Sequence, residues 1–399
     1  MHHPSLPRAA AVLSLLALLA LAHAPAAAAA PGEPGAATAA YLRARAAAGL
    51  TGGAGLRGLC VPGWAQLARE QVIARGVRHG HATLGQKLAS IECRVTIGGV
   101  TLAPDGRSAA VKAHAVTTLR WTAGGHDTDR EASGVDHTIA LRLVAGRWLV
   151  AGDTYFDDLA PRYLEAGGAS PTAVHAAATR LEARSRSFAV SARDPVALPA
   201  GPPAPAAGGP ASHPAGSGCG GDNSLVRTTR LGYRAILYYD RDAAKAYADK
   251  YALSYNPTYY AFSADCANFG SQTMFAGGYP KALGGYEQGW WYDKEGTSSP
   301  GNDTWSHSWI AVIPQMQYWN ARYTDVVSSI SECARGDFVY YDWTGNGTWD
   351  HVAELAGTNA SGQKVIDAHT TDHYQVYWKL GTSATHYRFA HTRAQIYIY

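Results

Sequence analysis

The stretch "SADCANFGSQTMFAGG", residues 263–278, decides how the second half of this 399-residue chain is interpreted. Phe269 and Met274 follow the cysteine at spacings that bury one side of a helix. A helix that begins at Cys266, with Asp265 as its cap, places the thiol beside unpaired backbone N–H groups. Those groups and the helix dipole favour a thiolate and can also hold an oxyanion. The stretch therefore predicts that Cys266 is a nucleophile and that Asp265 supports it.

A thiol nucleophile needs a base, and two histidines follow it in suitable places. His351 begins the expected strand "HVAEL", and His369 ends the next expected strand, "VIDAHT". Neighbouring antiparallel strands bring such positions side by side. We therefore predict that His351 takes the thiol proton and that His369 orients His351. Asp367, on the same strand face as His369, is the alternative orienting residue.

The motifs of this half resemble one family. "YDRDAAKAYADKYALSYNP", "DCANFGSQTMFAGG", "GDFVYYDW", "DHVAEL" and "AHTTDH" occur in the order seen in the putative amidase domain family of exported bacterial proteins. The resemblance covers about residues 230–399. That family is grouped with NlpC- and CHAP-type cysteine amidases and peptidases of papain-like fold. The resemblance implies Cys266 as nucleophile, His351 as general base and acid, and His369 as the third polar residue.

The resemblance has two further implications. NlpC-type enzymes often line the oxyanion site with an upstream tyrosine, for which Tyr255, Tyr259 and Tyr260 are all candidates in this sequence. Gly270 stands where the family usually has a bulky aliphatic residue after the Asn-Phe pair. We expect the helix to pack more loosely there.

The composition changes along the chain and predicts two domains. Residues 191–222 are rich in Pro, Ala and Gly and have almost no large apolar groups, which is typical of a linker. Residues 37–190 contain helical patterns near 37–49, 62–76 and 170–186 and alternating strands between them, which predicts a small α+β domain with an antiparallel meander. Residues 223–399 contain most of the tryptophans and tyrosines. The predicted fold class is α+β, with a papain-like helix-plus-antiparallel-sheet domain in this second half.

The beginning of the chain predicts export. Arg8 precedes a short apolar stretch and a run of small residues, so residues 1–30 have the pattern of a signal peptide. No later stretch approaches the ~18 continuous apolar residues that a membrane span requires, so no integral membrane association is expected. A net charge of +3 and no basic run give no reason to expect a nucleic-acid partner. We expect a secreted protein.

The five cysteines fit an oxidising compartment only if one of them stays free. Cys60 and Cys93 lie in the first half and are one possible pair, and Cys219 with Cys333 is a second. This scheme leaves Cys266 free, although the sequence does not fix the pairing. Cys333 is the rival nucleophile, but no helix follows it to activate its thiol.

Other functions were weighed against a cysteine enzyme. No HExxH motif or comparable ligand spacing occurs, so neither a metal nor another cofactor is expected. A transglutaminase-like acyl transfer would use the same Cys–His pair and cannot be separated from hydrolysis. A non-catalytic cell-wall or glycan-binding protein would use aromatic side chains as a groove. The candidates for that groove are Trp290, Trp291, Trp305, Trp309 and Trp343.

The sequence thus favours one function. We expect a secreted cysteine amidase or peptidase that hydrolyses an amide bond, with cell-wall peptide or peptidoglycan as its substrate. The glycan-binding protein is the alternative.

Overall fold

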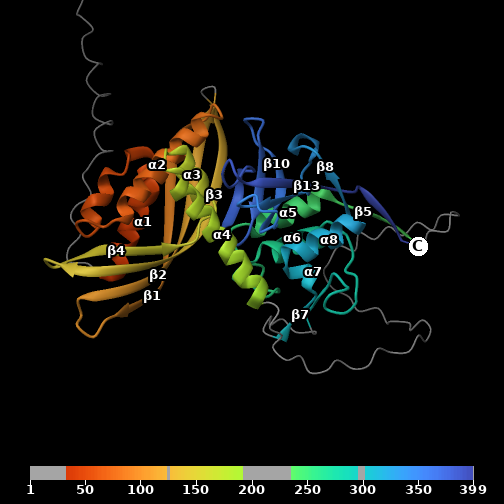
Figure 1. Cartoon of the computed structure of the whole chain (residues 1–399), viewed down its shortest axis with the longest axis horizontal. Helices are drawn as coiled ribbons and strands as arrows, with labels where there is room; N and C mark the ends of the chain where they lie inside the picture. The colour runs from red at the N-terminus through yellow and green to blue at the C-terminus, as the bar shows by residue number, and fades with distance from the viewer. Residues whose placement is uncertain (1–32, 124–125, 192–234, 295–301, 399) are drawn as a thin grey trace, which may run out of the picture.

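The computed structural model describes residues 33–123, 126–191, 235–294 and 302–398 of the chain (Figure 1). The predicted signal peptide, residues 1–30, lies outside these ranges. So does the predicted linker, except for its first residue, 191. The described residues combine helices with antiparallel strands, which confirms the α+β class. None of the helices in these ranges is both long and apolar enough to cross a bilayer.

The N-terminal half places two helices against a four-stranded antiparallel meander, as the sequence predicts. The helices are α1 (Pro34–Thr51) and α2 (Gln66–Ala82), with the short 3-10 helix η1 (Ala54–Leu59) between them. The strands are β1 (Lys87–Leu102), β2 (Ser108–Ala123), β3 (His126–Val144) and β4 (Arg147–Tyr155). Gly106 and Gly146 have φ angles of 66° and 76° in the hairpin turns, a region that glycine enters without strain.

Two more helices follow the meander and lead toward the second half of the chain. They are α3 (Ala160–Ala166) and α4 (Pro171–Ser191). In Figure 1, α4 runs between the meander and the C-terminal elements.

The C-terminal half contains three helices of eleven residues, short helices, and a set of antiparallel strands. The helices are α5 (Arg241–Tyr251), α6 (Cys266–Ala276), α7 (His307–Ile310), α8 (Val312–Arg322) and the 3-10 helix η3 (Ile330–Glu332). The strands of the large sheet are β8 (Thr324–Val327), β9 (Phe338–Asp342), β10 (His351–Thr358), β11 (Lys364–Ala368), β12 (Asp372–Tyr377) and β13 (His386–Thr392). Two small two-stranded sheets pair β5 (Ala235–Tyr238) with β14 (Gln395–Ile398) and β6 (Tyr292–Asp293) with β7 (Thr304–Trp305).

One ten-stranded sheet runs through both halves. Its strand order is β1-β2-β3-β12-β11-β10-β9-β13-β8, and β4 also pairs with β3. The two halves join where β3 pairs antiparallel with β12, with His373 opposite Ser133 and Asp372 opposite Gly134. A Cβ atom at Gly134 would lie only 3.3 Å from the Cβ of Asp372, so the missing side chain allows this close approach. The two predicted domains therefore share a sheet rather than meeting only through a linker.

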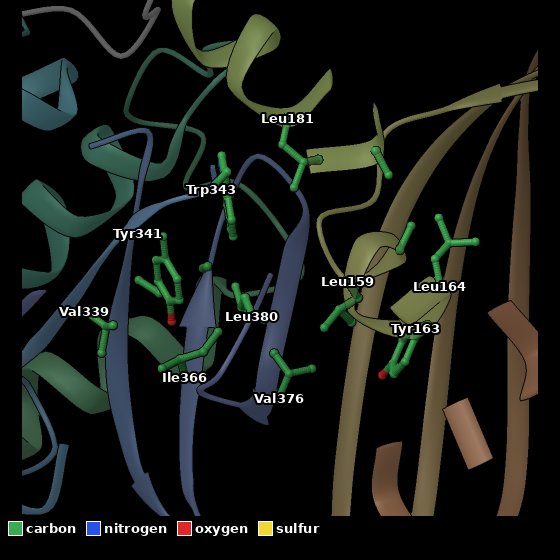
Figure 2. Close-up of a cluster of buried hydrophobic side chains, with 14 of the residues drawn as sticks. Leu159, Tyr163, Leu164, Leu181, Val339, Tyr341, Trp343, Ile366, Val376 and Leu380 are labelled. Atoms are coloured by element: carbon green, nitrogen blue, oxygen red, sulfur yellow. The ribbon is translucent and has the colours of Figure 1, made fainter. Parts of the chain in front are cut away.

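The two halves also share a hydrophobic core. Figure 2 shows side chains from the N-terminal half facing side chains from the C-terminal strands. The labelled members are Leu159, Tyr163, Leu164 and Leu181 on one side, and Val339, Tyr341, Trp343, Ile366, Val376 and Leu380 on the other. Full burial of one Leu or Val side chain is worth about 1.5–3 kcal/mol. A cluster of this size therefore holds the halves in a fixed relation.

A second core lies on the opposite face of the C-terminal strands. Side chains alternate between the two faces of a strand, so Val339 and Tyr341 belong to the shared core, whereas Phe338 and Tyr340 belong to the second core. The second core packs α6 and α8 against the sheet. The strands of this half are thus covered by N-terminal residues on one face and by their own helices on the other.

Of the five cysteines, the four that the structure describes are free thiols. Cys60, Cys266 and Cys333 are buried and Cys93 is half-buried. The suggested Cys60–Cys93 disulfide is not formed. Cys219 lies outside the described residues.

The contact between α2 and α3 offers a test of this packing. A Cβ at Gly76 would lie 1.7 Å from the backbone oxygen of Tyr163, whereas a Cβ at Gly80 has no neighbour closer than 3.8 Å. We expect Gly76→Ala to lower the free energy of unfolding by roughly 1–3 kcal/mol because α3 must move. Gly80→Ala is the matched control in the same helix and should leave stability unchanged or raise it by up to about 1 kcal/mol. Thermal unfolding of the two variants checks this, and equal melting temperatures would contradict the packing.

Candidate functional site

Cys266 is the first residue of α6, where the sequence places it. Its side chain is 5% exposed, and it lines a cavity of about 720 Å³. Ala264, Trp349 and Asp350 line the same cavity. The thiol is therefore on a helix tip at the wall of a hollow large enough for a small substrate.

Asp265 does not cap α6. Its carboxylate turns back and accepts hydrogen bonds from the backbone N–H of Phe262 (2.9 Å), from Asn268 Nδ2 (2.9 Å) and from His369 Nδ1 (2.7 Å). The capping prediction for Asp265 is wrong because these three donors already occupy the carboxylate. Asp265 instead ties the loop before the helix to the first turn and to His369.

Thr370, which follows β11, caps α6 in place of Asp265. Its hydroxyl oxygen accepts hydrogen bonds from the backbone N–H groups of Asp265 (2.9 Å) and Cys266 (3.2 Å). Thr370 has a φ angle of 86°, which is strained for a β-branched residue. Strain of this kind persists only where the surroundings enforce it, and it concentrates at functional sites.

Exchange of the Thr370 hydroxyl tests this assignment. Thr370→Val keeps the shape but leaves two N–H groups at the helix tip without an acceptor, so we expect a loss of about 1–2 kcal/mol in unfolding free energy. Thr370→Ser keeps the oxygen and should stay close to wild type. Chemical denaturation measures both, and a Val variant as stable as the Ser variant would rule out the capping role.

The charge state of Cys266 is set mainly by burial, which raises the pKa of the thiol to about 11. Hydrogen bonds from the Val352 N–H, the Thr370 hydroxyl and the Ala267 N–H act in the opposite direction, and the charge of Asp265 adds to the rise. At neutral pH the thiol is therefore protonated. A base must remove its proton before it can attack.

His351 begins β10, as predicted, and is 2% exposed. His351 precedes Val352, whose N–H reaches the thiol, but Val352 and Cys266 belong to the second core on the opposite face of the sheet. The His351 ring lies on the shared-core face, where it contacts Tyr341 and Trp343 at 5.5 and 5.4 Å between centroids. Among the described residues no hydrogen bond joins this ring to the thiol, and the Nε2 atom is buried without a partner. Burial lowers the pKa of His351 to about 4, so the ring is neutral at pH 7.

His369 contacts Asp265 rather than His351. Nδ1 donates to the Asp265 carboxylate at 2.7 Å, and Nε2 donates to the backbone oxygen of Tyr251 at 2.8 Å. Both partners are acceptors, so both ring nitrogens carry hydrogen and the ring is an imidazolium. Burial opposes that charge, but the bond to Asp265 outweighs it and raises the pKa of His369. The predicted contact between His369 and His351 is absent from the structure.

Asp367 lies away from Cys266, in a pair with Glu354. The two residues face each other across β10 and β11, and both are fully buried. Oδ1 of Asp367 accepts from the N–H of Gln375, and Oε1 of Glu354 accepts from the N–H of Gly336. Burial raises the pKa of both carboxyl groups; the charge of Asp367 raises the pKa of Glu354 further, and Asp249 raises that of Asp367.

This carboxyl pair gives the fold a pH dependence. Because both pKa values are raised on folding, the contribution of the pair is full below about pH 4 and is lost as pH rises toward the folded-state pKa values. Asp249 strengthens the effect and Lys245 opposes it. Glu354→Gln should raise the unfolding free energy at pH 8 by at least about 1 kcal/mol, since an amide cannot ionise and can donate to Asp367.

At pH 4 the same substitution should change little. Denaturation at both pH values measures the difference. A loss of stability at pH 8 would show that Glu354 is ionised and paired instead.

None of the three candidate tyrosines hydrogen-bonds to Cys266 in the structure. Tyr255 packs against His369, with 4.3 Å between ring centroids, and its hydroxyl donates to Asp372 at 3.2 Å. Tyr259 is buried in the second core, and Tyr260 packs against Trp305 at the surface. Tyr255 thus supports the His369 ring rather than the thiol.

Gly270 does not loosen the packing of α6. A Cβ at this position would lie 3.5 Å from ring atoms of both Phe338 and Trp319, which is ordinary contact. The aromatic rings thus fill the space that a larger aliphatic residue would take. The expected gap is absent.

The N-terminal half reaches the site through α4. Arg184 donates to the backbone oxygen of Ser263 at 2.9 Å, three residues before Cys266, and Ser185 lines the cavity. Glu182 accepts hydrogen bonds from Asn346 and Thr344 in the loop before His351. Sequence reasoning missed these contacts because the helical pattern near 170–186 does not indicate which part of the chain the helix packs against. It also missed Thr370, although this residue directly follows His369 in the "AHTTDH" motif.

No group of three or more His, Cys, Asp or Glu side chains in the described ranges could hold a metal ion. The cavity that Cys266 lines has aliphatic residues such as Ile310, Val312 and Ile313 as well as polar and aromatic ones. Among those lining the cavity are Glu287, Gln288, Gln317, Tyr318 and Arg322.

Comparison with known proteins confirms the family resemblance. Residues 238–392 match the family model described as "Putative amidase domain". The chain is 29% identical over 170 residues to "Uncharacterized protein YhbB" of Bacillus subtilis (strain 168), and the match covers 41% of this chain. The chain spans about half of that relative, 52% of its length.

A similarity search of solved structures matched the crystal structure of the intermembrane space region of the chloroplast protein ARC6. The match covers 30% of this chain and 91% of that one, with 12% sequence identity and a TM-score of 0.23.

Proposed function

We propose that the protein is a cysteine-dependent amidase in which Cys266 attacks an amide carbonyl and His351 transfers the protons. The observation that carries this proposal is the position of the thiol. Cys266 lies at the tip of α6, on the wall of the cavity, against the N–H group of the residue that follows His351. The amidase family match of residues 238–392 supports the same reaction class.

The charges favour a neutral pair over a resting ion pair. With a thiol pKa of about 11 and an imidazole pKa of about 4, Cys266 and His351 are both uncharged at pH 7. His351 then acts as a general base during the attack, as in a serine hydrolase. The thiol packs in the second core and the His351 ring on the shared-core face, so the proposal requires the ring to turn past the end of β10 toward the thiol when substrate binds.

The steps follow from these protonation states. The His351 ring takes the thiol proton while the sulfur bonds to the amide carbon. The tetrahedral intermediate collapses when the imidazolium gives that proton to the departing amine, which leaves a thioester on Cys266. Water, deprotonated by the same ring, then adds to the thioester and releases a carboxylic acid and the thiol. The Ala267 and Val352 N–H groups, which point at the sulfur, are candidates to hold the developing oxyanion.

The cavity suits a peptide that carries both charges. Arg322 offers a cation to a carboxylate, and Glu287, which pairs with His307 at 2.9 Å, offers an anion to an amine. Trp349 and Tyr318 supply aromatic surface to the same cavity. Cell-wall peptides combine acidic groups with diamino acids, so we propose peptidoglycan peptide as the substrate. The signal-peptide pattern of residues 1–30 and a papain-like arrangement of helix and sheet belong to the same proposal.

The rival glycan-binding function finds less support. A sugar groove needs exposed aromatic faces, but Trp290, Trp309 and Trp343 are each no more than 2% exposed and belong to the cores. Trp291 and Trp305 are only half-buried.

Turnover of purified peptidoglycan tests the proposal. Cys266→Ala and His351→Ala should each reduce the release of new amino groups by at least about a thousandfold, because nucleophile and base act as one unit. Cys333→Ala removes the rival buried thiol and should keep wild-type activity. Full activity of the Cys266 or His351 variant would refute the mechanism, and an inactive wild type would refute the substrate.

A further inference from the structure

We propose that the N-terminal half completes the catalytic site by supplying Asp158 as the positioning residue of His351. The inference rests on the proposed function, because it gives His351 a partner for its role as base. It also gives the N-terminal half a task, since the amidase family match begins only at residue 238.

Asp158 is fixed at the junction of the two halves. It lies between β4 and α3 and is 1% exposed. Its backbone N–H donates to the Thr371 hydroxyl at 3.3 Å, and its Oδ1 atom accepts from His373 Nε2 at 2.5 Å. His373 in turn bonds through Nδ1 to the hydroxyl of Ser133, the residue opposite it in the β3–β12 pair. The carboxylate is therefore held by both halves of the chain.

The Oδ2 atom of Asp158 makes no hydrogen bond of good geometry, although the Thr371 hydroxyl lies close enough to lower the pKa of the carboxyl. Asp158 Oδ2 and His351 Nε2 are both buried polar atoms without a hydrogen bond. Two such atoms are costly, and each needs what the other offers: a donor for the oxygen and an acceptor for the N–H.

The two groups lie on the same side of the sheet. His351 stacks on Trp343 and Tyr341, which belong to the shared core, and Leu159, the residue after Asp158, packs into that core (Figure 2). They are also within electrostatic range. Burial opposes ionisation of Asp158, but His373 and then His351 lower the pKa of its carboxyl. No direct hydrogen bond joins Oδ2 to Nε2, and the inference requires a bridging water or a shift of the ring to connect them.

This arrangement selects the useful form of the histidine. An Nε2–H directed at Asp158 leaves Nδ1 without hydrogen, so that Nδ1 can take the thiol proton. Once the ring is charged, the carboxylate stabilises the imidazolium. His369, the third residue that the family pattern implies, cannot do this because both of its nitrogens are occupied.

Other titratable groups near His351 do not fill this role. His373 repels a charged ring, and Tyr341 contacts the ring by its face. Burial raises the pKa of Asp157, whose Oδ1 accepts from the N–H of Leu159. Cys266 is the proton donor itself. Asp158 is therefore the one group with a buried oxygen to spare among the described residues that interact with this ring.

The test measures the alkylation of Cys266 by iodoacetamide between pH 5 and 10, followed by mass spectrometry of the Cys266 peptide in the full chain. Asp158→Asn keeps the acceptor for His373 but presents an N–H to His351, which reverses the tautomer. We expect alkylation at pH 7 to slow at least about tenfold, and His351→Ala to slow it as much or more. Ser133→Ala, which removes the junction hydrogen bond to His373 Nδ1 but leaves the Asp158 carboxylate, should alkylate like wild type.

The outcomes separate the two proposals. If His351→Ala slows alkylation and Asp158→Asn does not, Asp158 is not the positioning residue and the proposed function stands. If His351→Ala changes nothing, the Cys–His pair and this inference both fail. A slowing in Ser133→Ala equal to that in Asp158→Asn would show a merely structural role and overturn the inference.

A measurement on the unmutated chain remains decisive if Asp158→Asn does not fold. Nitrogen NMR of ¹⁵N-histidine protein, with His351 assigned by its loss in His351→Ala, reports which ring nitrogen carries hydrogen. The Nε2–H form at pH 7 supports the inference, and the Nδ1–H form overturns it.

Discussion

The pairing of β3 with β12 is the interaction on which the rest of the structure depends. It turns a meander and a second set of strands into one sheet, and Gly134 gives the two strands room to approach. Through this pairing, α3 and α4 cover a face of β9, β10 and β11 that would otherwise expose a continuous apolar surface. The position of Asp158 and the contact of α4 with the loop before Cys266 follow from the same junction.

Burial then decides the chemistry of the residues gathered there. Burial disfavours the charged form of both Cys266 and His351. It therefore raises the pKa of the thiol and lowers the pKa of the imidazole. His369 is equally buried but keeps its charge, since a carboxylate lies 2.7 Å away. The same degree of burial thus yields a neutral base at one histidine and a fixed cation at the other. The difference is the presence of a bonded anion.

The sequence predicted local features well and long-range contacts poorly. The helix tip at Cys266 and the strand at His351 follow from periodicity and motif order, and the structure has both. The sequence did not predict the role of His369, because its hydrogen-bond partner Asp265 comes close to it only in the folded chain. Asp158 had no signal at all, since a buried carboxylate with one unused oxygen is visible only when the surrounding groups are in place.

A resting thiol with a pKa of about 11 suits an enzyme that works outside the cell, as proposed here. At pH 7 about one molecule in ten thousand carries the thiolate, which is the form that oxidants attack. Its reactivity then depends on a neutral base that accepts the proton during attack on the substrate, rather than on a standing anion. The imidazole is a stronger base if a carboxylate near its other ring nitrogen stabilises the imidazolium. The N-terminal half is where the fold places such a charge, so the two halves are best understood as one catalytic unit.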